Sequence, residues 1–282
     1  MTVRHCPDIL RWLPPTWDLF LGNYRLKTVL RRLLTATRRQ IELGDTAVSN
    51  RPCLLVLGPS RTGKTALVKF FCRCLVCESL DPVPLNPCDG SCWACKQKPE
   101  LYGHSGIFLS LREASLGRKA SLPVHFVPID CTRIYTPAEL REILDDLRDG
   151  IAYNGIRVIY LDEVHRLVHR SMDEILLKAV EEQPYLWLLS SAKPGPLEDM
   201  LKNRLLKIGT QLPSEEEMES WLCDRCDEWG INWEPEAVVR IVEKSNRIVG
   251  TALHALALAA IAPNEGLTLD LVETEWTVQV ED

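Results

Sequence analysis

The chain has 282 residues, of which 46% are hydrophobic, so it can bury a substantial core as one large domain or two smaller ones. Its formal net charge of -6 argues against a protein that binds nucleic acid through an overall basic surface, although a local basic face is compatible with that charge. No apolar run approaches the ~20 residues of a membrane span, and the N-terminus has no signal-peptide core, which predicts a soluble, cytoplasmic protein without a membrane partner.

An aromatic, proline-marked segment over residues 12–23 precedes the first predicted helix, which covers residues 26–43. The apolar residues of this helix share one face at helical spacing: Leu26, Val29, Leu30, Leu33, Leu34 and Ile41. Four arginines lie among them: Arg31, Arg32, Arg38 and Arg39. They form either a solvated basic face or a contact with phosphate or with a partner.

A phosphate-binding loop is the strongest motif in the chain. Gly58–Thr65 fits G-x-x-x-x-G-K-[ST], between an apolar run suited to a buried parallel strand, Cys53–Leu57, and a predicted helix, Ala66–Leu75. In such a loop, backbone N–H groups and the helix N-terminus face phosphate oxygens. Lys64 can then reach the β- and γ-phosphates of ATP, and Thr65 can hold Mg²⁺. The predicted loop contacts are Gly58, Pro59, Ser60, Arg61, Thr62, Gly63, Lys64 and Thr65.

The cysteines indicate a metal site. Their number, 11, is odd in a sequence without an export signal, which favours metal binding or free thiols over a disulfide framework. Four of them have the spacing C-x10-C-x3-C-x2-C: Cys77, Cys88, Cys92 and Cys95. Thiolates at this spacing can converge on one tetrahedral Zn²⁺, which would order a turn-rich segment that has little apolar content. A site closed by four thiolates is structural and not catalytic. The alternatives are unligated thiols, or Cys72 and Cys74 as ligands; the Cys223–Cys226 pair is interpreted as ordinary thiols in a helix.

Two carboxylates end another buried strand, which is predicted over Arg157–Glu163. Beside a phosphate loop, Asp162 can hold Mg²⁺ through water and so contribute to cofactor binding, while Glu163 can polarise the attacking water. Phosphoryl transfer needs this division of roles. Between the loop and this strand the sequence predicts a hairpin or loop over Ser105–Leu122, a strand over Val124–Asp130 and a helix from a Thr136 cap to about residue 151.

In the second half of the chain, the predicted pattern changes from alternating helices and strands to helices alone. Before the change, the sequence predicts a helix over Ser171–Glu182, a strand over Trp187–Ser191 and a helix over Leu197–Leu206. The helices predicted after Pro213 begin at Ser214, cover Glu236–Lys244 and cover Gly250–Ile261. We therefore expect an α/β domain with a parallel sheet over residues 1–212, an all-α domain over residues 213–262 and a short acidic tail over residues 263–282.

These motifs together resemble the AAA+ ATPases, and within them the bacterial clamp-loader ATPase subunits of DNA polymerase III (the gamma/tau and delta-prime type). The resemblance covers residues 12–262. Four features carry it. The segment Trp17–Asn23 resembles the N-terminal box that borders the adenine pocket in this family, and the four-cysteine insert over about residues 77–95 resembles the family's zinc module. Leu161–Leu167 with the following helix over 176–184, and the strand end at Leu188–Ser191, resemble the family's carboxylate strand and sensor 1 strand.

The resemblance implies a P-loop AAA+ sheet with a zinc-module insert, followed by a helical lid domain. It also implies roles for particular residues. Ser191 matches sensor 1, a polar group near the γ-phosphate, and Arg204 matches the arginine finger, which acts in the site of a neighbouring subunit. The implied catalytic set is thus Lys64, Glu163, Ser191 and Arg204, in a homo- or hetero-oligomer that uses ATP, Mg²⁺ and Zn²⁺.

Three departures from the family pattern are visible. Arg204 is flanked by Asn203 and Leu205 where the family has Ser-Arg-Cys. Leu253 stands where the family has the phosphate-contacting sensor 2 arginine, and either Arg247 or His254 is the candidate to replace it. The sequence ends after the lid, so the family's collar domain is not expected.

The sequence therefore supports an ATP-hydrolysing module that assembles on DNA like a clamp loader, in replication or repair. The alternative is an ATP-dependent switch with weak or no hydrolysis that recruits a protein partner in replication, transposition or phage defence. A third hypothesis is a structural subunit that contributes mainly Arg204 to a neighbour. The candidate contacts with DNA backbone, which ordinary surface charge would also explain, are Arg166, His169, Arg170, Arg112, Arg118 and Lys119.

Overall fold

The computed structural model of the chain describes residues 6–10, 12–44, 52–81, 85–96, 124–149, 156–168, 172–193, 205–261 and 265–276. The chain forms two compact units. One is made of Arg25–Pro59 and Lys64–Thr210, and the other of Met1–Tyr24, Ser60–Gly63 and Gln211–Asp282. The change at residue 211 lies next to the division that the sequence predicts near residue 212. The N-terminal segment and loop residues 60–63 group with the second unit, which the sequence does not predict.

Five strands form one parallel sheet in the first unit. They are β1 (Cys53–Leu57), β2 (Val124–Asp130), β3 (Ile156–Asp162), β4 (Leu186–Ser191) and β5 (Leu205–Gly209), in the order β2-β3-β4-β1-β5. Parallel strands need crossover connections, so their carboxyl ends all meet at the same edge. In α/β sheets of this kind, ligands bind at that edge.

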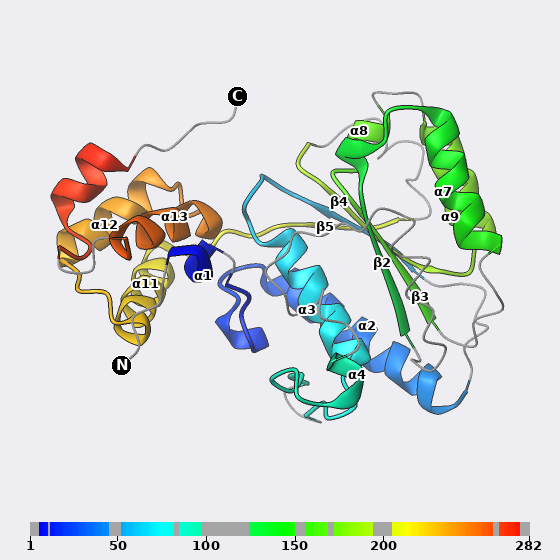
Figure 1. Cartoon of the computed structure of the whole chain (residues 1–282), viewed down its shortest axis with the longest axis horizontal. Helices are drawn as coiled ribbons and strands as arrows, with labels where there is room; N and C mark the ends of the chain where they lie inside the picture. Colours follow the sequence, from blue (N-terminus) through cyan, green and yellow to red (C-terminus); the bar gives the residue numbers. More distant parts are fainter. Residues whose placement is uncertain are drawn as a thin grey trace. The chain divides into compact units, whose positions relative to one another are not determined.

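Helices lie on both faces of this sheet (Figure 1). On one face are α2 (Tyr24–Glu42) and α3 (Lys64–Val76), and on the other are α7 (Pro137–Asp149) and α9 (Asp173–Glu182). The face toward α7 and α9 is apolar, and its buried cluster includes Leu55, Leu161 and Leu189. Because side chains alternate along a strand, the neighbours of these residues project toward α3. The remaining short elements of this unit are α4 (Trp93–Lys96), the 3₁₀ turn Cys131–Arg133 and α8 (His165–Val168).

The second unit is helical and has its own core. Its elements are α1 (Cys6–Leu10), the 3₁₀ turn Trp17–Leu19, α11 (Glu215–Trp229), α12 (Pro235–Lys244), α13 (Val249–Ala259) and a π-helical turn, Leu271–Glu275. Ser214 and Glu217 form the capping box that starts α11, so the predicted helix start is confirmed. The ring of Trp12 packs against the rings of Trp221 and Trp229, with centroids 5.9 and 5.4 Å apart.

Residues 265–276 belong to this helical core. The sequence prediction assigned them to a separate acidic tail, yet Leu267, Leu271, Val272 and Trp276 are buried in the same cluster as the helices. The backbone of Leu267 also forms a bridge with Trp233. The acidic side chains between the apolar ones face solvent, which explains why the composition of the segment resembles a tail.

The strand β5 corrects another prediction. The sequence predicts helix through Leu206, whereas Leu205–Gly209 pairs with β1 as an edge strand. Only Ile208 is buried in this strand, and Lys207 interrupts its apolar residues, so it lacks the continuous apolar run of a central strand. The predicted hairpin or loop at Ser105–Leu122 lies outside the described residues. Within the described part of the chain, no helix combines the length and the apolarity needed to cross a membrane.

Candidate nucleotide and metal sites

The phosphate-binding motif leaves the sheet at the carboxyl end of β1. The N–H of Gly58 donates to Ser191 O on β4 (3.1 Å), and the N–H of Thr210, after β5, donates to Leu57 O (2.7 Å). A Cβ on Gly58 would lie 1.8 Å from Thr210 Oγ1 and 2.8 Å from its Cβ. Only glycine therefore allows the loop to begin this close to the neighbouring strand.

Lys64, the first residue of α3, is buried at the same edge. Its ammonium donates to Gly58 O (2.7 Å) and Pro59 O (2.8 Å) of the loop. Burial lowers the pKa of Lys64, while the carboxylates of Glu163 and Asp162 oppose that shift. The ammonium thus lies under the loop and within the field of both carboxylates that end β3.

Thr65 and Asp162 meet across the sheet edge. The hydroxyl of Thr65 donates to Asp162 Oδ2 (3.0 Å), although the two residues are 97 positions apart in the sequence. A hydroxyl and a carboxylate are hard oxygen ligands, the kind that Mg²⁺ prefers. The residues therefore fit Mg²⁺ and a nucleotide: a lysine for phosphate charge, and two oxygen groups already in contact for the metal.

Glu163, next to Asp162, has a different environment. Its backbone has a positive φ of 53°, and its Oε2 lies 3.4 Å from the N–H of Ala192 and 3.2 Å from His165 Nδ1. Burial raises the pKa of Glu163, and the Asp162 charge adds to this shift whereas Lys64 opposes it. The two carboxylates are thus adjacent but have separate partners.

The two serines at the end of β4 have different partners. Ser191, the predicted sensor 1 residue, places its Oγ 3.2 Å from His165 Nδ1 and donates to Lys193 O (2.6 Å). The preceding Ser190 instead donates to Asp162 Oδ1. Sequence reasoning overlooked Ser190, His165 and Tyr160, which also contacts Asp162. The signal that could have found Ser190 and Tyr160 is the two-residue alternation along β3 and β4, which directs Tyr160, Asp162 and Ser190 to one face.

The tip of the loop, residues 60–63, is held within the helical unit. Asn23 is buried; its Nδ2 donates to Thr62 O (2.8 Å) and its Oδ1 accepts from the N–H of Gln211 (3.0 Å). The N–H of Gly250, at the start of α13, donates to Arg61 O (3.0 Å). A Cβ on Gly250 would lie 2.7 Å from that oxygen and 2.8 Å from Arg61 Cβ, so the helix approaches the loop as closely as glycine permits.

The candidates for the missing sensor 2 arginine lie in the same unit. Leu253 packs against the helical core. Burial, and then the charge of Arg61 in the loop, lower the pKa of His254. The guanidinium of Arg247 donates to Pro213 O at 3.5 Å. His254 therefore lies in the field of a loop residue, Arg61.

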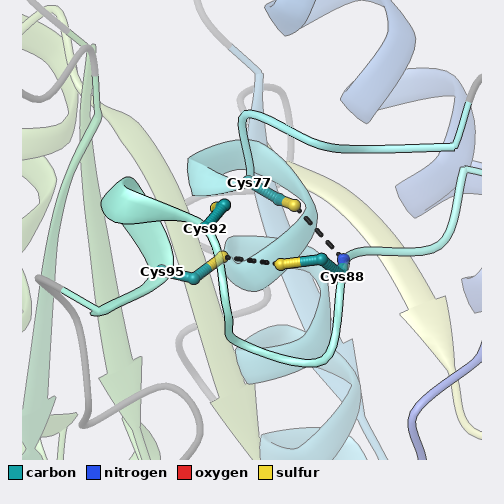
Figure 2. A group of neighbouring side chains, drawn as sticks. All are labelled: Cys77, Cys88, Cys92 and Cys95. Atoms are coloured by element: carbon teal, nitrogen blue, oxygen red, sulfur yellow. Dashed lines mark hydrogen bonds between the residues drawn. The ribbon is translucent and has the colours of Figure 1, made fainter.

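The four predicted zinc ligands converge (Figure 2). The Sγ atoms of Cys77, Cys88, Cys92 and Cys95 all lie within 4.8 Å of one another, with 3.7 Å between those of Cys88 and Cys95. Four Zn–S bonds of about 2.3 Å in a tetrahedron give S–S edges of about 3.8 Å. The cluster therefore fits one tetrahedral zinc ion. Neither Cys72 nor Cys74, the alternative ligands, is part of it.

Backbone donors favour thiolates in this cluster. Burial opposes ionisation of Cys88, but the N–H groups of Cys92 and Gly90 outweigh it and lower the pKa of this thiol to about 6. Burial raises the pKa of Cys77 to about 11, although the N–H of Cys88 donates to its Sγ (3.2 Å). A cation at the centre would stabilise the ionised form of all four thiols.

Arg38 on α2 anchors the cluster from outside. Its Nη1 donates to the carbonyl of Cys74 in the last turn of α3 (3.0 Å) and to the carbonyl of Cys77, which directly follows the helix (2.8 Å). This contact gives one of the four arginines on the predicted basic face a structural role. It satisfies carbonyls at a helix C-terminus, where a positive charge is favourable.

Several predicted functional residues lie outside the described residues. They are Arg204, the predicted arginine finger, and the candidate DNA contacts His169, Arg170, Arg112, Arg118 and Lys119. Arg166, the remaining candidate, is exposed at the start of α8.

The architecture is that of a P-loop α/β protein with a following helical unit, and comparisons with known proteins agree. No family model matches the chain. The tau subunit of DNA polymerase III from Escherichia coli (strain K12) is 26% identical over 260 residues, 91% of this chain and 34% of that protein. The gamma subunit from Buchnera aphidicola subsp. Schizaphis graminum is 26% identical over 204 residues, 72% of this chain and 50% of that protein.

Solved structures give the same fold. RuvB of Thermotoga maritima, a Holliday junction branch migration motor, covers 94% of this chain at 17% identity with a TM-score of 0.52, over 71% of its own length. A point variant of that protein has a TM-score of 0.55. These findings confirm the resemblance that the motifs predict, to AAA+ ATPases of the clamp-loader type. The chain spans between one third and one half of the length of the two polymerase subunits.

We predict that the cysteine cluster holds about one zinc ion per chain. Replacing Cys95 by Ser should abolish zinc retention and lower the melting temperature, because the turn-rich segment would lose the ion that orders it. Zinc content by atomic absorption and thermal unfolding with and without a chelator measure both effects. Cys223→Ser, a half-buried thiol outside the cluster, is the control and should retain the metal. Equal zinc contents in the two variants would contradict the assignment.

We also predict that Gly250→Ala weakens nucleotide binding. The added methyl must displace the Arg61 backbone, and overpacking of this kind typically costs about 1–3 kcal/mol. Because the displaced loop presents its N–H groups less well to a phosphate, we expect affinity for the nucleotide to fall by about fivefold or more. Titration with a fluorescent ATP analogue measures it. Gly209→Ala is the matched control, since a Cβ there meets nothing within 4 Å. If both variants bind like the wild type, the close approach of α13 does not constrain the loop.

Proposed function

We propose that the chain binds ATP with Mg²⁺ and hydrolyses it, as part of an oligomeric AAA+ assembly that acts on DNA in replication or repair. The observation that carries this proposal is the contact between Thr65 and Asp162, which joins the phosphate loop to the carboxylate strand. A folded α/β core does not require these two polar side chains to meet at the carboxyl edge of the sheet. A metal site does.

Each residue has a chemical role in this proposal. Lys64 would exchange its loop carbonyls for the β- and γ-phosphates, and Thr65 and Asp162 would hold Mg²⁺, directly and through water. The metal, when bound, neutralises charge on the phosphates. Glu163 would orient the attacking water, and Ser191 would contact the γ-phosphate from the end of β4. Arg204 would act in the site of a neighbouring subunit.

The contacts of Glu163 set a condition on this chemistry. Its Oε2 is shared by the N–H of Ala192 and by His165. Both contacts are at or above 3.2 Å, which is long for hydrogen bonds to a carboxylate. We therefore expect Glu163 to exchange them for water without a large cost.

The setting of the activity comes from the relatives. Two are named as subunits of DNA polymerase III, and the structural neighbour is named as a branch migration motor. We infer from these names a cytoplasmic role on DNA, through sequence-independent backbone contacts and with a protein partner. The cysteine cluster would serve as a structural zinc module and the helical unit as the lid.

A nucleotide switch is the second candidate function, and Leu253 favours it. This residue stands where the resemblance places the sensor 2 arginine, and its apolar side chain, which packs against the helical core, offers no charge to a phosphate. Without that charge, ATP would be bound but turned over slowly. His254, whose pKa is lowered by burial and by the charge of Arg61, is the residue that would have to replace the missing arginine.

We predict that Glu163→Gln lowers the ATPase rate by about 100-fold or more while ATP binding is retained, since the amide cannot act as a general base. Steady-state turnover and analogue binding measure the two effects. Lys64→Ala, by contrast, should lose binding itself. If the wild type binds ATP but Glu163→Gln leaves a slow basal rate unchanged, the switch is the correct function.

We predict that Arg204→Ala lowers the ATPase rate by about 1,000-fold or more, because an arginine finger stabilises charge in the transition state. The rate per subunit of the wild type should rise with protein concentration and with primed or duplex DNA, since the finger acts in trans. Lys202→Ala, two residues earlier, is the control and should keep this response. A wild-type rate that is independent of concentration, DNA and Arg204 would exclude the oligomeric mechanism.

A further inference from the structure

Tyr160 occupies a central position beneath the candidate nucleotide site. It lies on β3 opposite Leu188 of β4, two residues before Asp162, and its side chain is fully buried. Since side chains alternate along strands, Tyr160 and Asp162 project from the same face of β3, and Ser190 projects from that face of β4. This is the face that α3 covers, and Thr65 lies in its first turn.

The phenol hydroxyl touches every other polar side chain of this group. Tyr160 Oη lies 2.9 Å from Asp162 Oδ1, 3.1 Å from Thr65 Oγ1 and 3.1 Å from Ser190 Oγ. Thr65 itself donates to Asp162 Oδ2, and Ser190 donates to Asp162 Oδ1. Three hydroxyl groups therefore surround one carboxylate.

The hydroxyl protons that are available determine which group donates to which in this network. Each hydroxyl donates one hydrogen bond, and an ionised carboxylate only accepts. A tyrosine phenol is protonated at neutral pH, so the hydroxyl of Tyr160 donates one of its contacts. Its strongest acceptor is Asp162 Oδ1, because a hydrogen bond to a charged oxygen is about twice as strong as one to a neutral hydroxyl. The lone pairs of Thr65 Oγ1 then stay available for a metal.

Packing alone does not explain this hydroxyl. A phenylalanine would fill the same space below α3 without the cost of burying a polar group, which is about 1–3 kcal/mol when the group is poorly paired. A buried tyrosine usually has a hydrogen-bond partner for its hydroxyl. The partner in this case is the carboxylate proposed to hold Mg²⁺.

We infer that Tyr160 is a positioning residue for the magnesium site: its hydroxyl fixes Asp162 so that Oδ2 faces Thr65. The inference rests on the proposed nucleotide function and adds to it a residue that contacts neither nucleotide nor metal. Groups that orient metal ligands in this way typically change metal affinity or activity by about 10–100-fold when removed.

The test is the Mg²⁺ dependence of binding of a fluorescent ATP analogue to the full chain. Tyr160→Phe keeps the ring and removes only the hydroxyl. We expect the Mg²⁺ concentration for half-maximal binding to rise about tenfold or more. Binding of the analogue in EDTA should be unchanged, and saturating Mg²⁺ should restore both binding and turnover. Ser190→Ala, which removes another donor to Asp162, should shift the Mg²⁺ dependence in the same direction.

Tyr185→Phe is the matched control. Tyr185 is also buried, and its hydroxyl donates to Leu147 O (2.9 Å) and not to a member of the group around Asp162. Loss of this hydroxyl should therefore leave the Mg²⁺ dependence unchanged. If Tyr160→Phe has the same Mg²⁺ dependence as the wild type and Tyr185→Phe, the positioning role is wrong and the nucleotide function stands. If the wild type itself binds no analogue with Mg²⁺, the proposed function fails and this inference fails with it.

Discussion

The hydrogen bond between Thr65 and Asp162 is the constraint on which the candidate nucleotide site depends. Thr65 lies in the first turn of α3, the helix after β1, and Asp162 ends β3, with β4 between the two strands. The contact forms because all of these strands are parallel, so their carboxyl ends lie at one edge. The sheet thereby turns two motifs that are far apart in the sequence into one pair of oxygen ligands.

The two carboxylates at this edge have different degrees of constraint. Asp162 accepts hydrogen bonds from the hydroxyls of Thr65, Tyr160 and Ser190, which together fix its orientation. Glu163 instead has long contacts with one backbone N–H and one histidine, and burial raises its pKa. A metal ligand benefits from a fixed geometry, whereas a residue that orients water must be able to change partners. The neighbouring positions satisfy these opposite requirements through different sets of contacts.

The sequence was most informative where buried strands and functional motifs coincide. β1 has the predicted bounds because an interior strand that is covered on both faces is a continuous apolar run. The strand β5 escaped prediction because it lies at the edge and carries Lys207, and the buried segment 265–276 was obscured by its acidic residues. Tyr160 and Ser190 could not be found by motif, since their roles depend on the register of β3 and β4 and on the helix above them. A contact network of that kind is a property of the fold and not of any one segment.

The helix α3 explains why a metal cluster would accompany this site without taking part in its chemistry. Lys64 begins the helix and Cys77 directly follows its last residue, so the 13 residues separate the phosphate loop from the cysteines by about 20 Å. At that distance a zinc ion cannot contact a nucleotide held by the loop. Its effect would be mechanical: the cluster and Arg38 together fix the C-terminal end of α3, while the phosphate loop forms the other end. Loss of the metal should therefore weaken the fold around α3 first and affect nucleotide binding only through that helix.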